Sequence, residues 1–431
     1  MLFHTLRLSG LLSFGPDGID LPMKPLNVLI GPNGSGKSNL LEAISLFQAA
    51  PRSISERISR TGGIREWTWK GVEASDSITM EVIVSFLPGP SSRAPSAIFV
   101  NPDMPSTDLP LRGMLRHHLT LVGRDGRTIM ADEQVEPLET SPETHDEVAY
   151  YRPPRDKQAA AALDAAAQRI SKSGSAHGDA WPAFVQGRQG ALEFAGEYRA
   201  DESLLSFFAS PNFPALWHLK EQYRRIRLYR NWSFGPDAAS REPCSAHARS
   251  DFLDEGAGNL PLVLSQLHGT QRKTFLTALD KLFDGIVDVQ CPVTGGTVSL
   301  FLDEAGGRSI PASRLSDGTL RYLSLLAVLL HPEPPPLICI EEPELGLHPD
   351  LLPTLADLMI EASERSQLIV TTHSDVLVDA LTDRPESVVV CEKHDGRTAM
   401  RRLDKADLAK WLKDYRLGDL WTSGELGGNR W

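Results

Sequence analysis

Apolar residues recur with strand and helix spacing in two parts of the chain, residues 1–86 and 250–431. In the first part, the mostly apolar run Leu26–Ile30 predicts a buried strand that leads into a glycine-rich turn. The segment Ser38–Gln48 follows at once, and its apolar residues share one helical face over nearly three turns. Leu2–Leu8 partly alternates and Glu81–Phe86 is strand-like, so we expect further short strands around this strand–turn–helix unit.

The second part repeats the pattern. Leu337–Ile340 and Leu368–Thr372 read as buried strands, and a helix over Leu351–Ala362 separates them. A strand, a crossover helix and a second strand are typical of a parallel α/β sheet. Upstream, apolar residues from Phe275 to Ile286 predict a helix, and Val298–Leu302 predicts a strand.

Between these parts, the composition shifts over residues 87–250. Its first segment is broken by prolines, which exclude a continuous helix or central strand there: Pro88, Pro90, Pro95, Pro102, Pro105 and Pro110. The segments His117–Val122 and Thr128–Val135 flank a turn with Asp125-Gly126 and predict a hairpin. An alanine-rich helix is expected over Lys157–Ile170. We therefore expect an insertion that carries a small α-rich lobe.

Composition and charge narrow the class of protein. The chain has 431 residues, 41% of them hydrophobic and 23% charged, which is ordinary globular usage. A net charge of −12 argues against a protein that coats nucleic acid indiscriminately, because such binding needs a broad basic surface. The four cysteines are far apart, which gives neither a zinc-site spacing nor a disulfide framework. No apolar run is long enough to span a membrane and no export signal is visible, so we expect a cytoplasmic protein without a membrane partner.

The glycine-rich turn after the first buried strand matches the P-loop pattern in full. In a P-loop, backbone N–H groups surround the phosphates, the lysine reaches the β- and γ-phosphates and the serine hydroxyl binds Mg²⁺. Lys37 and Ser38 take those roles, so ATP is the expected substrate and Mg²⁺ the expected cofactor. The expected nucleotide-binding residues are Gly31, Pro32, Asn33, Gly34, Ser35, Gly36, Lys37, Ser38 and Asn39.

The strand Leu337–Ile340 ends in consecutive carboxylates and reads as a Walker B strand. Glu341 is positioned to hold Mg²⁺ and Glu342 to orient the attacking water. Upstream, Leu315, Ser316, Asp317, Gly318 and Thr319 precede an apolar helical stretch, so Ser316 and Gly318 can present an anion-binding helix N-terminus. His373 follows the strand after Walker B, where it would contact a γ-phosphate; a structural histidine is the alternative.

Taken in order, Gly31–Ser38, Leu315–Thr319, Ile340–Glu344 and His373 resemble the ATP-binding cassette heads of the SMC, RecF and OLD-type ATPases. The chain is similar to single-chain AAA family ATPases of ABC type. The resemblance implies that Leu315–Thr319 is the signature, which contacts ATP held by a second subunit, so that ATP joins a homodimer. It also implies that Glu342 is the catalytic base, that His373 is the switch histidine and that Lys37 is essential.

The resemblance fits an α/β ABC-ATPase head with a mixed or parallel central sheet, N-terminal antiparallel β elements and the α-rich insertion. Three segments are expected. Residues 1–86 form the lobe with Walker A, residues 87–250 form an arm or lid, and residues 251–431 carry the signature, Walker B and the switch histidine.

The chain departs from the family pattern at Glu341, where aspartate is usual, and at Asp317 and Thr319, which replace a glycine and a glutamine. The glutamine of the glutamine loop is not assigned, because Gln48, Gln134 and Gln222 all fit the order of motifs.

Two features have a functional and a packing interpretation. The basic stretch Lys220–Arg230, with Tyr223 and Tyr229, suits phosphate contacts, but a packed and solvated face is the commoner case. The pair Trp67 and Trp69 suits base stacking or a half-buried strand. An acidic cluster of Asp132, Glu133, Glu136 and Glu139 reads as a solvated edge of the hairpin.

The motifs and the resemblance leave three functions open. The first is an ATP-gated, homodimerising ATPase that acts on DNA or other nucleic acid, in repair or in defence against foreign DNA. The second is a slowly hydrolysing sensor or scaffold for a separate effector protein, which the departures at Glu341 and Asp317 favour. The third is a toxic enzyme with its chemistry in residues 87–250, where the sequence contains no metal-ligand or nucleophile pattern.

Overall fold

The computed structural model describes residues 1–71, 77–85, 113–138, 148–151, 180–186, 192–207, 214–230, 232–282 and 285–428. The chain divides into two compact units. Unit 1 contains Met1–Met23, Asn39–Ile226 and Lys393–Met400, and unit 2 contains Lys24–Ser38, Arg227–Glu392 and Arg401–Trp431. The division into segments at residues 86 and 250 stays a prediction, and the expected helix Lys157–Ile170 lies outside the described residues.

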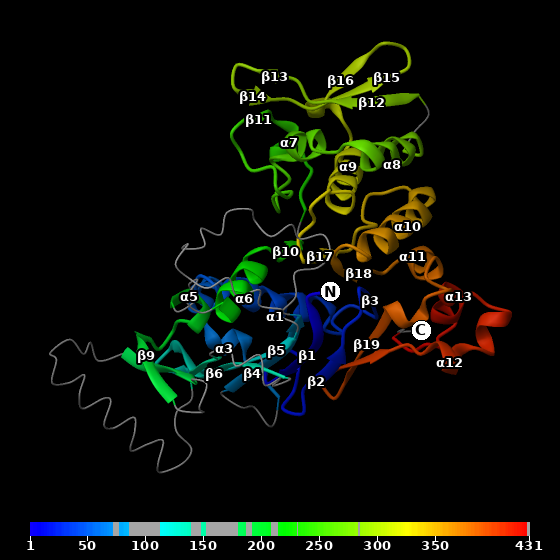
Figure 1. Ribbon diagram of the computed structural model, residues 1–431. Helices are drawn as coiled ribbons and strands as arrows, with labels where there is room; N and C mark the ends of the chain where they lie inside the picture. Colours follow the sequence, from blue (N-terminus) through cyan, green and yellow to red (C-terminus); the bar gives the residue numbers. More distant parts are fainter. Residues whose placement is uncertain are drawn as a thin grey trace. The chain divides into compact units, whose positions relative to one another are not determined.

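Unit 1 is built on an eight-stranded sheet in the order β2-β1-β4-β5-β6-β7-β8-β9, whose neighbours pair antiparallel (Figure 1). The strands are β1 Phe3–Ser9, β2 Ile19–Pro22, β4 Ser77–Ser85, β5 Met114–Arg124, β6 Arg127–Pro137, β7 Val148–Tyr151, β8 Ala180–Gln186 and β9 Leu192–Arg199. The helices are α2 Ile54–Arg60, α3 Ile64–Trp67, α5 Leu204–Phe207 and α6 Pro214–Arg224. The expected hairpin is confirmed as β5 and β6, and its turn has Asp125 and Gly126 at positive φ.

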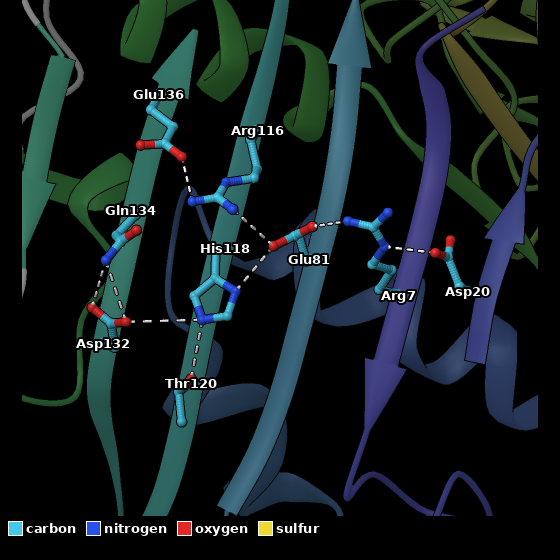
Figure 2. Close-up of polar contacts among 9 residues, drawn as sticks. All are labelled: Arg7, Asp20, Glu81, Arg116, His118, Thr120, Asp132, Gln134 and Glu136. Atoms are coloured by element: carbon cyan, nitrogen blue, oxygen red, sulfur yellow. Dashed lines mark hydrogen bonds and ion pairs between the residues drawn. The ribbon is translucent and has the colours of Figure 1, made fainter. Parts of the chain in front are cut away.

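The two faces of this sheet differ because side chains alternate along each strand. His117 is fully buried, whereas its neighbour His118 points to the other face. On that face Glu81 pairs with Arg7 at 2.6 Å, Arg116 at 3.6 Å and His118 at 3.4 Å (Figure 2). The charged side chains of this face pair largely with one another, which satisfies its polar groups.

The acidic cluster of the hairpin does not form one solvated edge. Glu133 is completely buried, and its carboxylate accepts hydrogen bonds from Ser203 Oγ at 2.6 Å and from the Leu204 backbone N–H at 2.8 Å. His117 Nε2 lies 3.1 Å from the same carboxylate and His117 Nδ1 lies 3.0 Å from the Tyr223 hydroxyl. The expectation for Glu133 was wrong because Ser203 and Leu204, which supply its hydrogen bonds, are 70 and 71 positions away in the sequence. Asp132 and Glu136 do lie on the polar face, and Glu139 is outside the described residues.

Most of a six-stranded sheet, in the order β10-β17-β18-β3-β19-β20, belongs to unit 2. Lys393–Met400, which covers the end of β19 and most of β20, is grouped with unit 1. The pairs β10–β17, β17–β18, β18–β3 and β3–β19 are all parallel, as the sequence predicts. The strands are β3 Leu26–Ile30, β10 Arg227–Tyr229, β17 Leu337–Glu341, β18 Gln367–Thr371, β19 Val388–His394 and β20 Arg397–Arg402. β3 and β18 are buried along their whole length, as expected for inner strands of a parallel sheet.

Helix α1, Lys37–Ala49, follows β3 after the glycine-rich turn and continues into unit 1. The other helices of unit 2 are α7 Leu260–Ser265, α8 Gly269–Asp280, α9 Asp317–Leu329, α10 Leu352–Ser363, α11 Asp375–Asp379, α12 Lys405–Leu408 and α13 Leu417–Thr422. Two small sheets complete the unit: β11 Cys244–Ser245, β14 Thr297–Val298 and β13 Val293–Thr294 form one, and β12 Ile286–Gln290, β15 Phe301–Glu304 and β16 Ser309–Pro311 form the other. Two boundaries differ from expectation: the helix at Phe275 ends at Asp280, so Ile286 begins a strand, and Val298–Leu302 is split between two sheets.

One apolar core holds unit 2 together, with buried residues from β3, β17 and β18 and from α7 to α10. Along the described part of the chain, no helix combines the length and apolar character needed to cross a bilayer.

Candidate functional site

The P-loop lies at the carboxyl edge of the parallel sheet of unit 2, where ligands bind in open α/β sheets. Gly31 has φ 145°, and a Cβ there would lie 2.2 Å from the Cys391 carbonyl oxygen, so only glycine fits. The Lys37 ammonium donates hydrogen bonds to the carbonyl oxygens of Gly31 at 2.7 Å and Pro32 at 3.1 Å. Burial lowers the pKa of Lys37, although nearby carboxylates, including Glu342, act in the opposite direction. The Lys37 side chain thus packs against the P-loop, whose backbone suits phosphate binding.

The other expected residues of the loop are placed as follows. Ser35 and Gly36 are buried, whereas Asn33, Gly34 and Ser38 are exposed. Asn39 belongs to unit 1, where its side-chain amide donates a hydrogen bond to Ser13 Oγ at 2.7 Å.

Ser38 joins the P-loop to the Walker B strand β17, because its hydroxyl donates a hydrogen bond to Glu341 Oε1. A serine hydroxyl beside a carboxylate is a hard-oxygen set of the kind Mg²⁺ prefers. The residues present therefore fit the expected magnesium site. Among the described residues, no group of three or more His, Cys, Asp and Glu side chains is arranged to hold a metal.

Glu342 has an unusual backbone. Its φ is 48°, in the left-handed region that non-glycine residues rarely occupy, and its N–H donates to the Thr371 carbonyl oxygen at 3.0 Å. Such strain is often found at active sites. The Glu342 carboxylate lies 3.6 Å from His373 Nε2, so the ends of β17 and β18 bring together two of the three expected catalytic residues, the third being Lys37.

A further carboxylate orients His373. Glu344 Oε1 accepts hydrogen bonds from the His373 backbone N–H at 2.7 Å and from Thr372 Oγ1 at 2.8 Å. Burial raises the pKa of Glu344, and burial together with the Lys37 charge lowers the pKa of His373, so neutral imidazole is favoured near pH 7. Glu344 stands in the Glu-Glu-Pro-Glu run, but the sequence pattern alone assigns it no individual role.

The expected signature begins α9. Ser316 is its N-cap and accepts a hydrogen bond from the Thr319 N–H at 3.1 Å. Ser316 and Asp317 are exposed, whereas Leu315 and Thr319 are buried. Because Gly318 lies against the Gly346 carbonyl oxygen, the signature contacts the loop that follows Walker B.

Arg241 fixes the start of this helix and was missed by sequence analysis. Its guanidinium donates to the Leu315 carbonyl oxygen at 2.6 Å and pairs with the Asp317 carboxylate. It also donates to the Phe234 carbonyl oxygen at 2.9 Å. A surface pocket of about 350 Å³ lies beside these residues, lined in part by Trp232, Phe234, Gly318 and Arg321.

The basic stretch and the tryptophan pair favour the packing interpretation. Tyr223 and Tyr229 are buried, and the Arg227 guanidinium lies 3.3 Å from the ring centroid of Phe252. Trp67 and Trp69 are buried as well, so neither offers an open stacking face.

The three glutamine candidates all belong to unit 1, whereas Walker A, the signature and Walker B belong to unit 2. Gln48 donates to the Ile226 carbonyl oxygen at 2.8 Å, Gln134 lies on β6 beside Asp132 and Gln222 lies on α6. The end of β10, next to Walker B, carries Arg230, which pairs with Glu341.

A family model described as "AAA domain, putative AbiEii toxin, Type IV TA system" matches residues 26–173 and 189–379, more than half of the chain. No curated protein is significantly similar to the chain in sequence.

Among solved structures, an Smc head bound to the C-winged helix domain of ScpA is similar with 15% identity and a TM-score of 0.52, over 94% of this chain and 99% of that one. An Smc head domain with an extended coiled coil from Pyrococcus furiosus gives 14% identity and a TM-score of 0.49, over 96% and 99%. The SMC head domain from Thermotoga maritima gives 14% and 0.44, over 94% and 100%. The similarity to the first of these structures, the Smc head bound to the ScpA domain, shows a shared fold.

Proposed function

The chain belongs to the AAA domain family whose description names a putative AbiEii toxin of type IV toxin–antitoxin systems, and from that premise we propose that it hydrolyses ATP in a site completed by a second copy. Its fold is that of an ABC-type, SMC-like P-loop ATPase head, as the sequence predicts. The observation that carries the proposal is the convergence of Lys37, Glu341, Glu342 and His373 at one edge of the parallel sheet.

In this mechanism the P-loop binds the phosphates. Backbone N–H groups and Lys37 hold the β- and γ-phosphates, and Ser38 and Glu341 hold Mg²⁺. When bound, the ion neutralises charge on the phosphates. Lys37 donates to the Gly31 carbonyl oxygen and interacts electrostatically with the Walker B carboxylates, so it would exchange its carbonyl contacts for phosphate contacts when ATP binds.

Glu342 is proposed as the base that accepts a proton from the attacking water. His373, oriented by Glu344 and held neutral, is proposed to stabilise the γ-phosphate through Nε2. The strained backbone of Glu342 restricts where its carboxylate can lie. This favours a single position for the attacking water.

The second copy would supply its signature. Ser316 and Asp317 are exposed at the N-terminal end of a helix of 13 residues, and the positive end of that helix dipole suits a γ-phosphate. We therefore propose that ATP joins two chains and that hydrolysis releases them. DNA is the proposed target. We also propose a cytoplasmic location, which suits four free cysteines.

The second candidate is a slowly hydrolysing sensor for a separate effector protein. Glu341 in place of aspartate favours it, because a longer carboxylate changes the metal site. The similar Smc head is described as bound to a domain of ScpA, which makes a protein partner a reasonable alternative to DNA.

Phosphate release by the purified chain with Mg-ATP, with and without duplex DNA, tests both candidates. We expect turnover in the parent, loss of ATP binding in Lys37→Ala, and retained binding in Glu342→Gln with turnover reduced about 100-fold or more. Glu364→Gln, at an exposed position, is the matched control and should keep full turnover. Unchanged turnover in Glu342→Gln would refute the base assignment. No turnover under any condition, with effector binding intact, would favour the sensor.

A further inference from the structure

The register of the parallel sheet places Arg230 beside the Walker B carboxylate of Glu341. Strand β10 pairs in parallel with β17, and Tyr229 lies opposite Ile340. Arg230 directly follows β10 and Glu341 is the last residue of β17, so both lie at the carboxyl edge of the sheet. Arg230 Nε donates to Glu341 Oε2 at 3.0 Å, and each side chain is only 17% exposed.

The two oxygens of Glu341 have different partners. Oε2 is bound by Arg230, whereas Oε1 accepts the hydrogen bond from Ser38. The carboxylate is thus held at both ends, with Oε1 turned toward the serine hydroxyl that belongs to the magnesium site. A half-buried arginine–carboxylate pair of this kind is more firmly oriented than an exposed pair.

Glutamate has one more rotatable bond than aspartate, so its carboxylate is less restricted when nothing else holds it. At a metal site such freedom weakens binding, because the ligand must be ordered each time the ion binds. An anchor on Oε2 removes that freedom while leaving Oε1 for the ion. Arg230 thus compensates for the longer side chain at position 341, where glutamate stands in place of the usual aspartate.

We propose that Arg230 is a positioning residue for Mg²⁺, which fixes the Glu341 carboxylate so that Oε1 and the Ser38 hydroxyl face the ion together. This inference rests on the proposed function, since it requires that Ser38 and Glu341 bind Mg²⁺ with a nucleotide. Arg230 acts through Glu341 and not by direct contact with a phosphate.

Calorimetric titration of the full chain with the non-hydrolysable analogue AMP-PNP, in EDTA and in MgCl₂, tests the inference without relying on turnover. The quantity compared is the gain in affinity that Mg²⁺ confers. We expect Arg230→Ala to reduce this gain about 10- to 100-fold and to leave the affinity in EDTA nearly unchanged. Arg230→Lys should restore only part of the gain, because an ammonium keeps the charge without the planar geometry.

A double variant separates positioning from direct contact. Glu341→Gln should lose most of the gain alone, and adding Arg230→Ala to it should change little more. Arg308→Ala is the matched control, because Arg308 also pairs with a glutamate but is 80% exposed and lies in the turn between β15 and β16. Circular dichroism of each variant verifies the fold.

Three results would overturn the inference. Arg230→Ala with an undiminished magnesium gain would refute positioning, and an equal loss in EDTA would indicate direct phosphate contact instead. A parent that binds AMP-PNP neither in EDTA nor in MgCl₂ would overturn the proposed function as well. If Mg²⁺ raises the AMP-PNP affinity of the parent, the ATPase proposal stands. A failure seen only in Arg230→Ala then concerns the positioning role of Arg230 alone.

Discussion

A Cβ atom on Gly318 would lie 2.5 Å from the carbonyl oxygen of Gly346, so the signature and the loop after Walker B touch through a position that only glycine can fill. Because backbone cannot move as easily as a side-chain tip, Gly318→Ala must displace either the start of α9 or that loop. We expect a cost of about 1 to 3 kcal/mol and a clear loss of ATP turnover. Gly306→Ala, where a Cβ meets nothing within 4 Å, is the control. Equal turnover and equal melting temperatures of the two variants would contradict this close contact.

The proposed contact across the dimer predicts the effect of Ser316→Arg. Ser316 is exposed, so a long cation there should block the approach of a second copy. It also removes the N-cap of α9, which should cost about 1 kcal/mol and leave ATP binding by the monomer intact. Light scattering after addition of Mg-ATP checks this. Ser265→Arg, at another exposed position of unit 2, should still dimerise. Normal dimers of Ser316→Arg would show that the signature does not act between copies.

The buried Glu133 predicts a contrast with Glu136 on the same strand. Glu133→Ala leaves the Leu204 N–H, the Ser203 hydroxyl and His117 without their shared acceptor, which should destabilise unit 1 by about 3 kcal/mol or more. Glu136→Ala removes only a part-exposed pair with Arg116, worth at most about 1 kcal/mol. Urea unfolding of the two variants measures the difference, and similar shifts would contradict the buried network.

His331 predicts part of the pH dependence of stability. Burial lowers its pKa, even though Nε2 donates to the Ser250 carbonyl oxygen and Nδ1 accepts from the Glu333 N–H. Below its ordinary value of about 6.5, the unfolded chain therefore binds more protons than the folded one. The contribution of His331 to the free energy of unfolding is therefore complete above its ordinary pKa. It decreases as the pH falls toward the lower pKa of the folded state.

The slope contributed by one such histidine is at most about 1.4 kcal/mol per pH unit. Urea unfolding between about pH 7.5 and about pH 5 should give a shallower slope for His331→Gln than for the parent. An identical slope would mean that His331 is charged equally in both states.

Sequence alone predicted the elements whose signals are local. Leu26–Ile30 is a strand in the structure, a helix begins at Lys37, and β17 and β18 carry Glu341 and His373 to one edge. These succeed because a buried strand, a glycine-rich turn and an amphipathic helix each leave a complete pattern within about ten residues.

Contacts between distant residues were not predictable. Arg230 and Glu341 are 111 positions apart, and Arg241 and Asp317 are 76 apart. Each pair is formed by sheet register or loop packing, for which one sequence holds no signal. The burial of Glu133 was missed for the same reason, since an acidic run in a hairpin is usually solvated.

In the proposed mechanism, ATP joins two copies of this chain. Size-exclusion chromatography with light scattering on Glu342→Gln, with and without Mg-ATP, tests it most directly, because this variant should bind ATP without hydrolysing it. We expect Glu342→Gln to be a monomer without nucleotide and a dimer with Mg-ATP, and the double variant Lys37→Ala, Glu342→Gln to stay monomeric. A mass that is the same with and without Mg-ATP would contradict the composite site.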